Sequence, residues 1–236
     1  MNKANKPTQI PLDFGSLLEK SFENFIIGKN AIIIDSIKAF TSSESTKIIF
    51  IYGKRSFGKT HLCLAALNKI KSAKEFIDFE TAYKLDNLDV DSINHLIIDD
   101  LDKILENEQY QDKIFFCINE FILNRRPLLL TSSKTITKMK INKYDLESRL
   151  KSDLIFTIDD YSDDDKAKVL ENFAIARGWN IDTKVTNYIM NNYQRDLFFL
   201  CNIIKNIDEE SLSSKKNITI PFVKHVISSR DSIETH

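Results

Sequence analysis

The sequence of 236 residues has little glycine, proline or cysteine, and no excess of charge of either sign. Its net charge of −1 excludes a uniformly basic nucleic-acid coat and a polybasic membrane binder. Only 5 glycines and 4 prolines are present, so linkers are scarce. Three cysteines (Cys63, Cys117 and Cys201) lie far apart among apolar neighbours. This spacing indicates reduced core thiols, as in a cytoplasm, and argues against a disulfide framework or a zinc site.

Long apolar runs are also missing. No segment reaches the roughly 20 apolar residues that a membrane-spanning helix needs. The N-terminal residues MNKANKPTQIPLDFG lack the apolar core of a signal peptide. We therefore expect a cytoplasmic protein without a membrane partner. With 42% hydrophobic and 28% charged residues, the chain can form a core, as one domain plus a smaller one.

Strand-like and helix-like segments alternate over the first two thirds of the chain. Continuous β-prone runs predict buried parallel strands, and apolar residues at helical spacing predict helices between them. The predicted strands are 48–52, 75–79, 95–98, 128–130 and 154–158, and the predicted helices are 59–70 and 113–124. This alternation indicates an α/β domain whose parallel sheet is covered on both faces.

The remaining third of the chain has only helical patterns. Ser162, followed by three aspartates, is a suitable helix N-cap, and Pro221 fits the first turn of the last helix. We expect breaks near Gly178-Trp179 and near 211–217. The expected organisation is a tail over 1–21, an α/β domain over 22–160 and a small all-helical domain over 161–236.

A phosphate-binding motif lies between the first predicted strand and the helix that follows it. Residues 53–60, GKRSFGKT, fit the pattern GxxxxGK[ST]. Gly53 and Gly58 let backbone amides face phosphate oxygens, and the helix N-terminus adds positive potential. Lys59 would reach the β- and γ-phosphates, and Thr60 would hold a magnesium ion. The sequence therefore predicts binding of ADP or ATP with magnesium.

Two aspartates, Asp99 and Asp100, directly follow a buried strand. A carboxylate at this place can complete the magnesium shell, and its neighbour can orient a water molecule. We assign the metal role to Asp99, together with Thr60, and the water role to Asp100. The alternative is a solvated strand end without function. The phosphate-binding motif upstream favours the functional interpretation.

Several segments together resemble the DnaA-type AAA+ ATPases. Residues 22–30, FENFIIGKN, are similar to the adenine-side box of that family, and residues 146–150, LESRL, to its arginine-finger box. Three further segments lie between these two boxes in the same order as in the family: the phosphate loop (53–60), residues 96–100 (LIIDD) and residues 130–133 (LTSS). The resemblance covers about residues 22 to 230. It implies an AAA+ base with a helical lid, with Ile26 and Ile27 at the nucleotide. It also implies that Arg149 faces the nucleotide of a neighbouring subunit, of the same or another protein.

The N-terminal tail carries a second resemblance. Residues 9–14, QIPLDF, are similar to the peptide with which bacterial proteins dock on the sliding clamp, the β subunit of DNA polymerase III. Leu12 and Phe14 would anchor in an apolar pocket while the Gln9 amide fixes the orientation. The alternative is that Leu12 and Phe14 pack on their own domain.

A DnaA-like body that carries this peptide and is followed by no helix-turn-helix domain resembles the regulatory inactivators of the family. That resemblance implies two partners, DnaA and the clamp. Together with the near-neutral charge, it predicts no direct sequence-specific binding of DNA.

Two positions depart from the family pattern. Phe198 stands where the lid usually has an arginine that senses the γ-phosphate, and Ser133 stands where DnaA often has an acidic first sensor. Arg195 precedes Phe198 by three residues, and on a continuous helix the two would share a face. The alternative for Arg195 is a surface charge beside Asp196. Both departures predict weak or no ATP hydrolysis by the chain itself, and neither affects Arg149.

The sequence favours an activator that holds nucleotide, docks on the DNA-loaded clamp and lends Arg149 to ATP on DnaA, which prevents re-initiation. An arginine finger supplied in trans contributes roughly 10³ to 10⁵ in rate. The alternative for Arg149 is an ion pair with Glu147 or Asp153 on a surface helix. The alternatives for the chain are a DNA-stimulated AAA+ ATPase of the helicase-loader or transposition-helper type, and an interaction protein without nucleotide.

Overall fold

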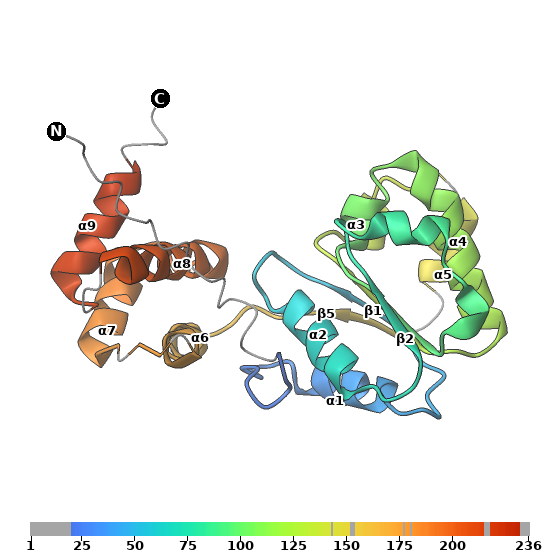
Figure 1. Cartoon of the computed structure of the whole chain (residues 1–236), viewed down its shortest axis with the longest axis horizontal. Coiled ribbons are helices and arrows are strands. Elements are labelled where there is room, and N and C mark those ends of the chain that lie inside the picture. Colours follow the sequence, from blue (N-terminus) through green and yellow to red (C-terminus); the bar gives the residue numbers. More distant parts are fainter. Residues whose placement is uncertain are drawn as a thin grey trace, which may run out of the picture. The chain divides into compact units, whose positions relative to one another are not determined.

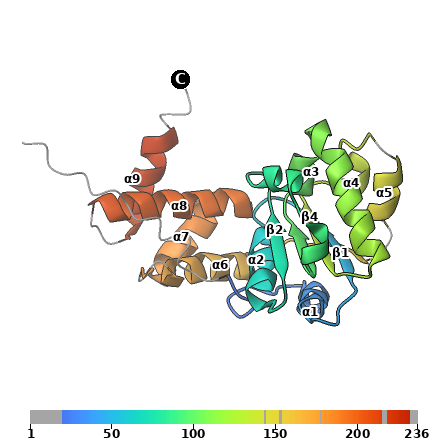
Figure 2. The same cartoon turned by 45° about the vertical axis from the view of Figure 1, so that its right-hand side comes forward.

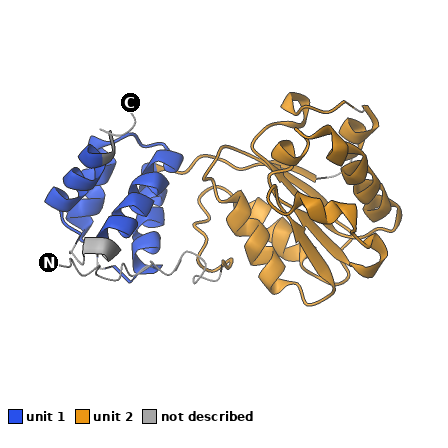
Figure 3. Cartoon of the chain, turned by 45° about the horizontal axis from the view of Figure 1, so that its top comes forward, with its two compact units in different colours: residues 1–19, 163–236 blue, residues 20–162 orange. Residues whose placement is uncertain are grey.

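The computed structural model describes residues 20–142, 144–151, 154–176, 178–179, 181–214 and 218–231. The described residues fall into two compact units, which divide between Ser162 and Asp163 (Figure 3). The first unit along the described chain, orange in Figure 3, has a sheet with helices, and the second, blue in Figure 3, has helices only.

A five-stranded parallel sheet forms the centre of the first unit, with the strand order β2-β3-β4-β1-β5. The strands are β1 (Ile48–Tyr52), β2 (Lys74–Ile77), β3 (His95–Ile98), β4 (Leu128–Ser132) and β5 (Leu154–Thr157). All residues of β3 and β4 are buried, which confirms the parallel sheet that the continuous apolar runs predicted. β1 lies between β4 and β5, so Tyr52 pairs with Ser132 and with Thr157.

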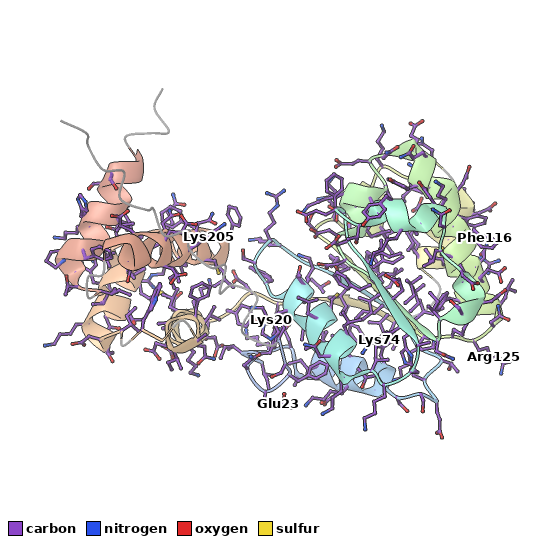
Figure 4. All side chains as sticks on the ribbon, in the orientation of Figure 1. Lys20, Glu23, Lys74, Phe116, Arg125 and Lys205 are labelled. Carbon is purple, nitrogen blue, oxygen red and sulfur yellow. The ribbon has the colours of Figure 1, made fainter. Side chains whose placement is uncertain are left out.

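Helices cover both faces of the sheet. One face carries α1 (Ala31–Phe40) and α2 (Lys59–Lys69), and the other carries α3 (Leu101–Ile104), α4 (Glu108–Leu123) and α5 (Tyr144–Leu150) (Figure 1). Three short 3₁₀ helices are η2 (Ala82–Asp86), η3 (Val90–Ser92) and η4 (Ile136–Lys138). Because strand side chains alternate between faces, Phe50 and Leu130 join the core under α3 to α5. On the outer side of α4, Phe116 projects away from the sheet and is 56% exposed (Figure 4).

Two helices of the first unit differ from the sequence-based expectation. α4 begins at Glu108, five residues earlier than expected, because the Asn107 side chain accepts a hydrogen bond of 3.2 Å from the backbone N–H of Gln109. We predicted no element over residues 31–40, where the structure has α1. Its buried side chains lie at helical spacing and are Ile33, Ile34, Ile37 and Phe40.

The second unit contains four helices within the described residues (Figure 2). They are α6 (Asp163–Ala176), α7 (Thr183–Asn192), α8 (Leu197–Ser214) and α9 (Ile220–Asp231). Their apolar faces meet in one core, in which Leu170, Ile189 and Val223 are fully buried. Pro221 is the second residue of α9, in the first turn as expected. None of the described helices combines the length and apolarity that a bilayer span requires.

The second unit also has a break that we did not predict. α7 ends at Asn192 and α8 begins at Leu197, so Arg195 lies in the loop between them. The expectation that Arg195 and Phe198 share the face of a continuous helix is therefore wrong. The physical reason is Asp196, whose Oδ1 accepts hydrogen bonds from the backbone N–H groups of Phe198 and Phe199 at 3.0 and 3.2 Å. These bonds form an N-cap, which starts a new helix.

Candidate nucleotide-binding site

The loop between β1 and α2 has the backbone shape of an anion-binding nest. Gly58 has φ +89° and directly precedes α2, and Ser56 also has a positive φ of 63°. Left-handed residues next to right-handed ones turn successive N–H groups toward one point, where an anion binds. A Cβ at Gly58 would lie 2.5 Å from Cε2 of Phe25, so only glycine fits there. The glycine that the motif predicted is thus required by both conformation and packing.

Lys59 lies at the start of α2 and is held against the loop. Its Nζ donates hydrogen bonds to the backbone oxygens of Gly53 at 2.7 Å and Lys54 at 2.9 Å, and the residue is only 6% exposed. Burial lowers the pKa of Lys59, and the neighbouring charges of Asp100 and Asp99 oppose this shift. The two bonds use two of the three N–H donors of the ammonium group. The remaining donor suits a phosphate oxygen.

Asp99 receives two threonine hydroxyls. Thr60 Oγ1 donates to Oδ2 of Asp99 at 2.6 Å, and Thr131 Oγ1 donates to Oδ1. Asp99 is 3% exposed, and this burial raises its pKa, against the effect of the two hydroxyl bonds. A threonine hydroxyl beside a carboxylate is the oxygen pair that holds magnesium at a nucleotide phosphate. The residues present therefore fit a magnesium ion brought by the nucleotide.

Asp100 has a different set of partners from the one we expected. It leaves β3 with φ 51°, and its backbone N–H donates to Thr131 Oγ1 at 3.1 Å. Its Oδ2 forms an ion pair of 2.5 Å with Nζ of Lys103, which is three residues further on. The carboxylate that we assigned to a water molecule is thus paired with a lysine. The i, i+3 spacing of the two residues was the signal in the sequence.

Asp102 is a site residue that we did not predict. It is 2% exposed, and its Oδ1 accepts from the Ser132 hydroxyl at 3.0 Å and from the Ser133 N–H at 2.9 Å. Its Oδ2 accepts from the Ser133 hydroxyl at 2.5 Å. Burial by itself would raise the pKa of Asp102, but the bonds from Ser133 and Ser132 bring it below the ordinary value. The expected sensor Ser133 is therefore tied to an ionised carboxylate.

The segment 22–30 packs against the phosphate loop. The ring of Phe25, which contacts Gly58, lies 5.3 Å from the His61 ring and 6.5 Å from the Tyr161 ring, measured between centroids. Of the two residues expected at the nucleotide, Ile26 is half-buried and Ile27 is 46% exposed. An exposed aliphatic side chain beside a phosphate loop suits the flat, apolar face of a base. Their contact with adenine stays a prediction.

Known proteins share the fold and the lid. Residues 163–227 match the family model described as Hda, lid domain. The structure is similar to the crystal structure of domain III of the Thermotoga maritima replication initiation protein DnaA. The TM-score is 0.78 at 18% identity, over 90% of this chain and 97% of that one. The helical region is thus similar to the lid of Hda, and the fold of the chain is similar to that of DnaA domain III.

Two further proteins are similar to this chain. An uncharacterized protein of Haemophilus influenzae is 29% identical over 231 residues, which are 93% of this chain and 98% of that protein. AMPPCP-bound DnaA from Aquifex aeolicus is similar with a TM-score of 0.66 at 21% identity, over 80% of this chain and 65% of that one.

Arg149 lies on a helix on the other side of the sheet from the helix that follows the phosphate loop. It is exposed on α5, which covers the face of the sheet opposite to the face under α2 (Figure 1). Glu147, one of the two ion-pair partners considered for Arg149 from the sequence, forms an ion pair of 2.5 Å with Lys151. The other one, Asp153, lies outside the described residues. Arg149 and Lys59 thus lie on helices that cover opposite faces of the sheet.

Arg195 has two partners within the second unit. Its Nη1 donates to Oδ2 of Asp163, at the start of α6, and its Nε donates to the Met190 oxygen at 3.0 Å. The arginine thus links the loop after α7 to α6. Phe198 is 43% exposed. A sensor role for Arg195 stays a prediction. The predicted clamp peptide with Gln9, Leu12 and Phe14 lies outside the described residues.

Proposed function

We propose that this protein holds a nucleotide at its phosphate loop and stimulates ATP hydrolysis on DnaA with Arg149, while its N-terminal peptide docks on the DNA-loaded sliding clamp. The observation that carries the proposal is the placement of Arg149. Its side chain is exposed on α5, and α5 lies on the other side of the sheet from Lys59. A guanidinium so placed is accessible to the nucleotide of a second molecule.

The contribution of Arg149 is electrostatic. As phosphoryl transfer proceeds, negative charge develops on the transferred group, and a guanidinium stabilises it with fixed charge and two parallel donors. A finger supplied in trans is worth roughly 10³ to 10⁵ in rate, or about 4–7 kcal/mol of barrier. The bound ATP and the attacking water belong to DnaA. This chain supplies position and one positive charge.

The chain's own nucleotide has a holding role in this proposal. Lys59 would pair with phosphate oxygens, and Thr60 and Asp99 would hold the magnesium ion, whose charge offsets that of the phosphates. The similarity to AMPPCP-bound DnaA supports nucleotide binding at this fold. We further propose that ADP is the nucleotide held during activation, because activation by Arg149 needs no hydrolysis in the chain's own site.

Three features of the chain support weak hydrolysis. The Asp100 carboxylate is paired with Lys103, the Ser133 hydroxyl is bonded to Asp102, and the lid has Phe198 where the family usually has an arginine. Groups that would orient a water molecule or sense a γ-phosphate thus have other partners or are replaced. These features favour an activator over a self-acting ATPase.

Docking on the clamp would place the activator on replicating DNA. Residues 9–14 offer two apolar anchors and one amide, a combination that suits a small pocket. A tether raises the effective concentration of the linked module near its target, up to about the millimolar range for short flexible linkers. DnaA would then be converted to its ADP form after the clamp is loaded, so that replication starts once per cycle.

The experiment that tests the proposal measures ATP hydrolysis by DnaA with and without this protein, each with and without DNA-loaded clamp. We expect stimulation that requires the loaded clamp. The absence of stimulation by this protein, both with and without the loaded clamp, would refute the proposal. Hydrolysis by the isolated chain that rises on addition of DNA would identify it as an ATPase of the helicase-loader or transposition-helper type instead.

A further inference from the structure

Ser133 lies at the end of β4, next to the phosphate loop. The residue before it, Ser132, pairs with Tyr52 of β1, and its backbone oxygen accepts a 3.2 Å hydrogen bond from the N–H of Gly53, the first residue of the loop. Ser133 therefore directly follows a residue that is hydrogen-bonded to the loop. Its hydroxyl donates to Oδ2 of Asp102 at 2.5 Å, a short bond.

Asp102 is an ionised carboxylate, which can only accept hydrogen bonds. Its pKa lies below the ordinary value because Ser133 and Ser132 donate to it, in spite of burial, so it is ionised at neutral pH. Its charge also acts on Lys59, whose pKa it raises, together with the larger effects of Asp100 and Asp99. Asp102 is thus close enough to the phosphate-binding lysine for their charges to interact.

The hydrogen bond to Asp102 uses the only O–H donor of the Ser133 hydroxyl. A serine hydroxyl has one O–H group, so it donates to one acceptor at a time. Charge-assisted hydrogen bonds are stronger than neutral ones. A γ-phosphate that approached Ser133 would have to replace Asp102 as the acceptor. A nucleoside diphosphate has no γ-phosphate and leaves the bond intact.

We propose that Asp102 is a positioning residue that lowers the affinity of the phosphate loop for a nucleoside triphosphate relative to a diphosphate, by holding the Ser133 hydroxyl. This inference rests on the nucleotide binding proposed above. The neighbouring carboxylates hold other groups: Asp99 accepts from Thr60 and Thr131, and Asp100 is paired with Lys103. Asp102 alone among these three carboxylates is bonded to the expected sensor.

The test is calorimetric titration of the full chain with AMPPCP and with ADP, both with magnesium. Asp102→Asn keeps one oxygen acceptor but weakens the hold on the hydroxyl. We expect the ratio of AMPPCP affinity to ADP affinity to rise about tenfold, as the loss of a charge-assisted bond predicts. In a Ser133→Ala background, the same substitution should change the ratio by less than about twofold, because the coupled partner is absent. Equal rises in both backgrounds would overturn the proposal.

A structural role of Asp102 would give a different result. It would weaken both nucleotides together and leave their ratio unchanged. Asp78→Asn is the matched control, because Asp78, which directly follows β2, also accepts a backbone and a side-chain hydrogen bond, both from Thr81. It should change thermal stability without changing the ratio. Asp102→Gln is the second variant if Asp102→Asn does not fold at the assay temperature.

The outcomes separate this inference from the proposed function. If the wild-type chain binds neither nucleotide, nucleotide holding itself is refuted. If the wild-type chain binds both, and the ratio stays the same in folded Asp102→Asn and Asp102→Gln, only the role of Asp102 is refuted.

Discussion

Thr60 and Asp99 are 39 residues apart in the sequence and share a hydrogen bond of 2.6 Å. The bond joins the first turn of α2 to the end of β3, although β4 lies between β3 and β1 in the sheet. Thr131 of that intervening strand donates to the other carboxylate oxygen. Two hydroxyls thus satisfy a carboxylate that is buried, which makes its burial tolerable. The same oxygens are the ones that a nucleotide-bound magnesium ion would use.

Arg149→Ala should abolish the stimulation of DnaA. The side chain is exposed, so its loss should leave folding and clamp binding unchanged. We expect hydrolysis on DnaA to fall by roughly 10³-fold or more, because a finger in trans is worth that much. Lys151→Ala is the control, since it removes another positive charge near the same end of α5. Normal stimulation by Arg149→Ala would refute the finger role.

Lys59→Ala should weaken nucleotide binding. The substitution removes the cation at the N-terminus of α2 together with its two hydrogen bonds to the loop backbone. We expect the affinity for ADP to fall at least about tenfold, as for the loss of a charged hydrogen bond. Lys54→Ala, at an exposed position of the same loop, should have a much smaller effect. If ADP co-purifies with Lys59→Ala undiminished, the phosphate loop is not what holds it.

Replacement of Gln9, Leu12 and Phe14 by alanine should abolish binding to the clamp. The two apolar anchors and the amide supply most of the binding energy of such a peptide. Surface plasmon resonance with immobilised clamp measures the affinity of the variant for the clamp. Titration of the variant with ADP should give the same ADP affinity as the wild-type chain. Lys6→Ala, in the same tail, is the control. Unchanged clamp affinity in the triple variant would remove the docking claim.

The stability of the first unit should fall in mild acid because of His95. The side chain is 0% exposed, its Nδ1 is bonded to the Ser72 hydroxyl at 2.9 Å, and its Nε2 to the Phe40 oxygen at 3.0 Å. Burial lowers the pKa of His95, so the folded chain holds it neutral, while the unfolded chain binds a proton below about pH 6.5. Stability is therefore present above that pH and lost as the pH falls.

Urea unfolding at pH 7.5 and pH 5.0 measures this effect. A single histidine contributes at most about 1.4 kcal/mol per pH unit below its unfolded pKa. The wild-type chain should lose more free energy of unfolding between the two pH values than His95→Gln does. His61, whose pKa burial also lowers, titrates in the same range, so His61→Gln serves as the comparison. An equal pH dependence of wild type and His95→Gln would contradict the prediction.

Local patterns were sufficient for most of the fold. A continuous apolar run places a buried parallel strand, and the motif from Gly53 to Thr60 places a phosphate loop, because both depend on neighbours in the sequence. Helix boundaries were less accessible. The starts of α4 and α8 depend on the cap residues Asn107 and Asp196, whose side chains accept from backbone N–H groups two or three residues later. A polar residue before an apolar run was the available signal.

The sequence by itself determined the parallel sheet, the phosphate loop and the types of residue in the phosphate-binding site, because composition and short-range spacing specify these. Only the tertiary structure decided which side chains meet. Ser133 bonds to Asp102 because the ends of β4 and β3 are neighbours in the sheet, and Arg149 is kept from Lys59 because their helices cover opposite faces. Strand order and helix placement follow from burying the apolar faces of the whole chain at once, and no local pattern contains that information.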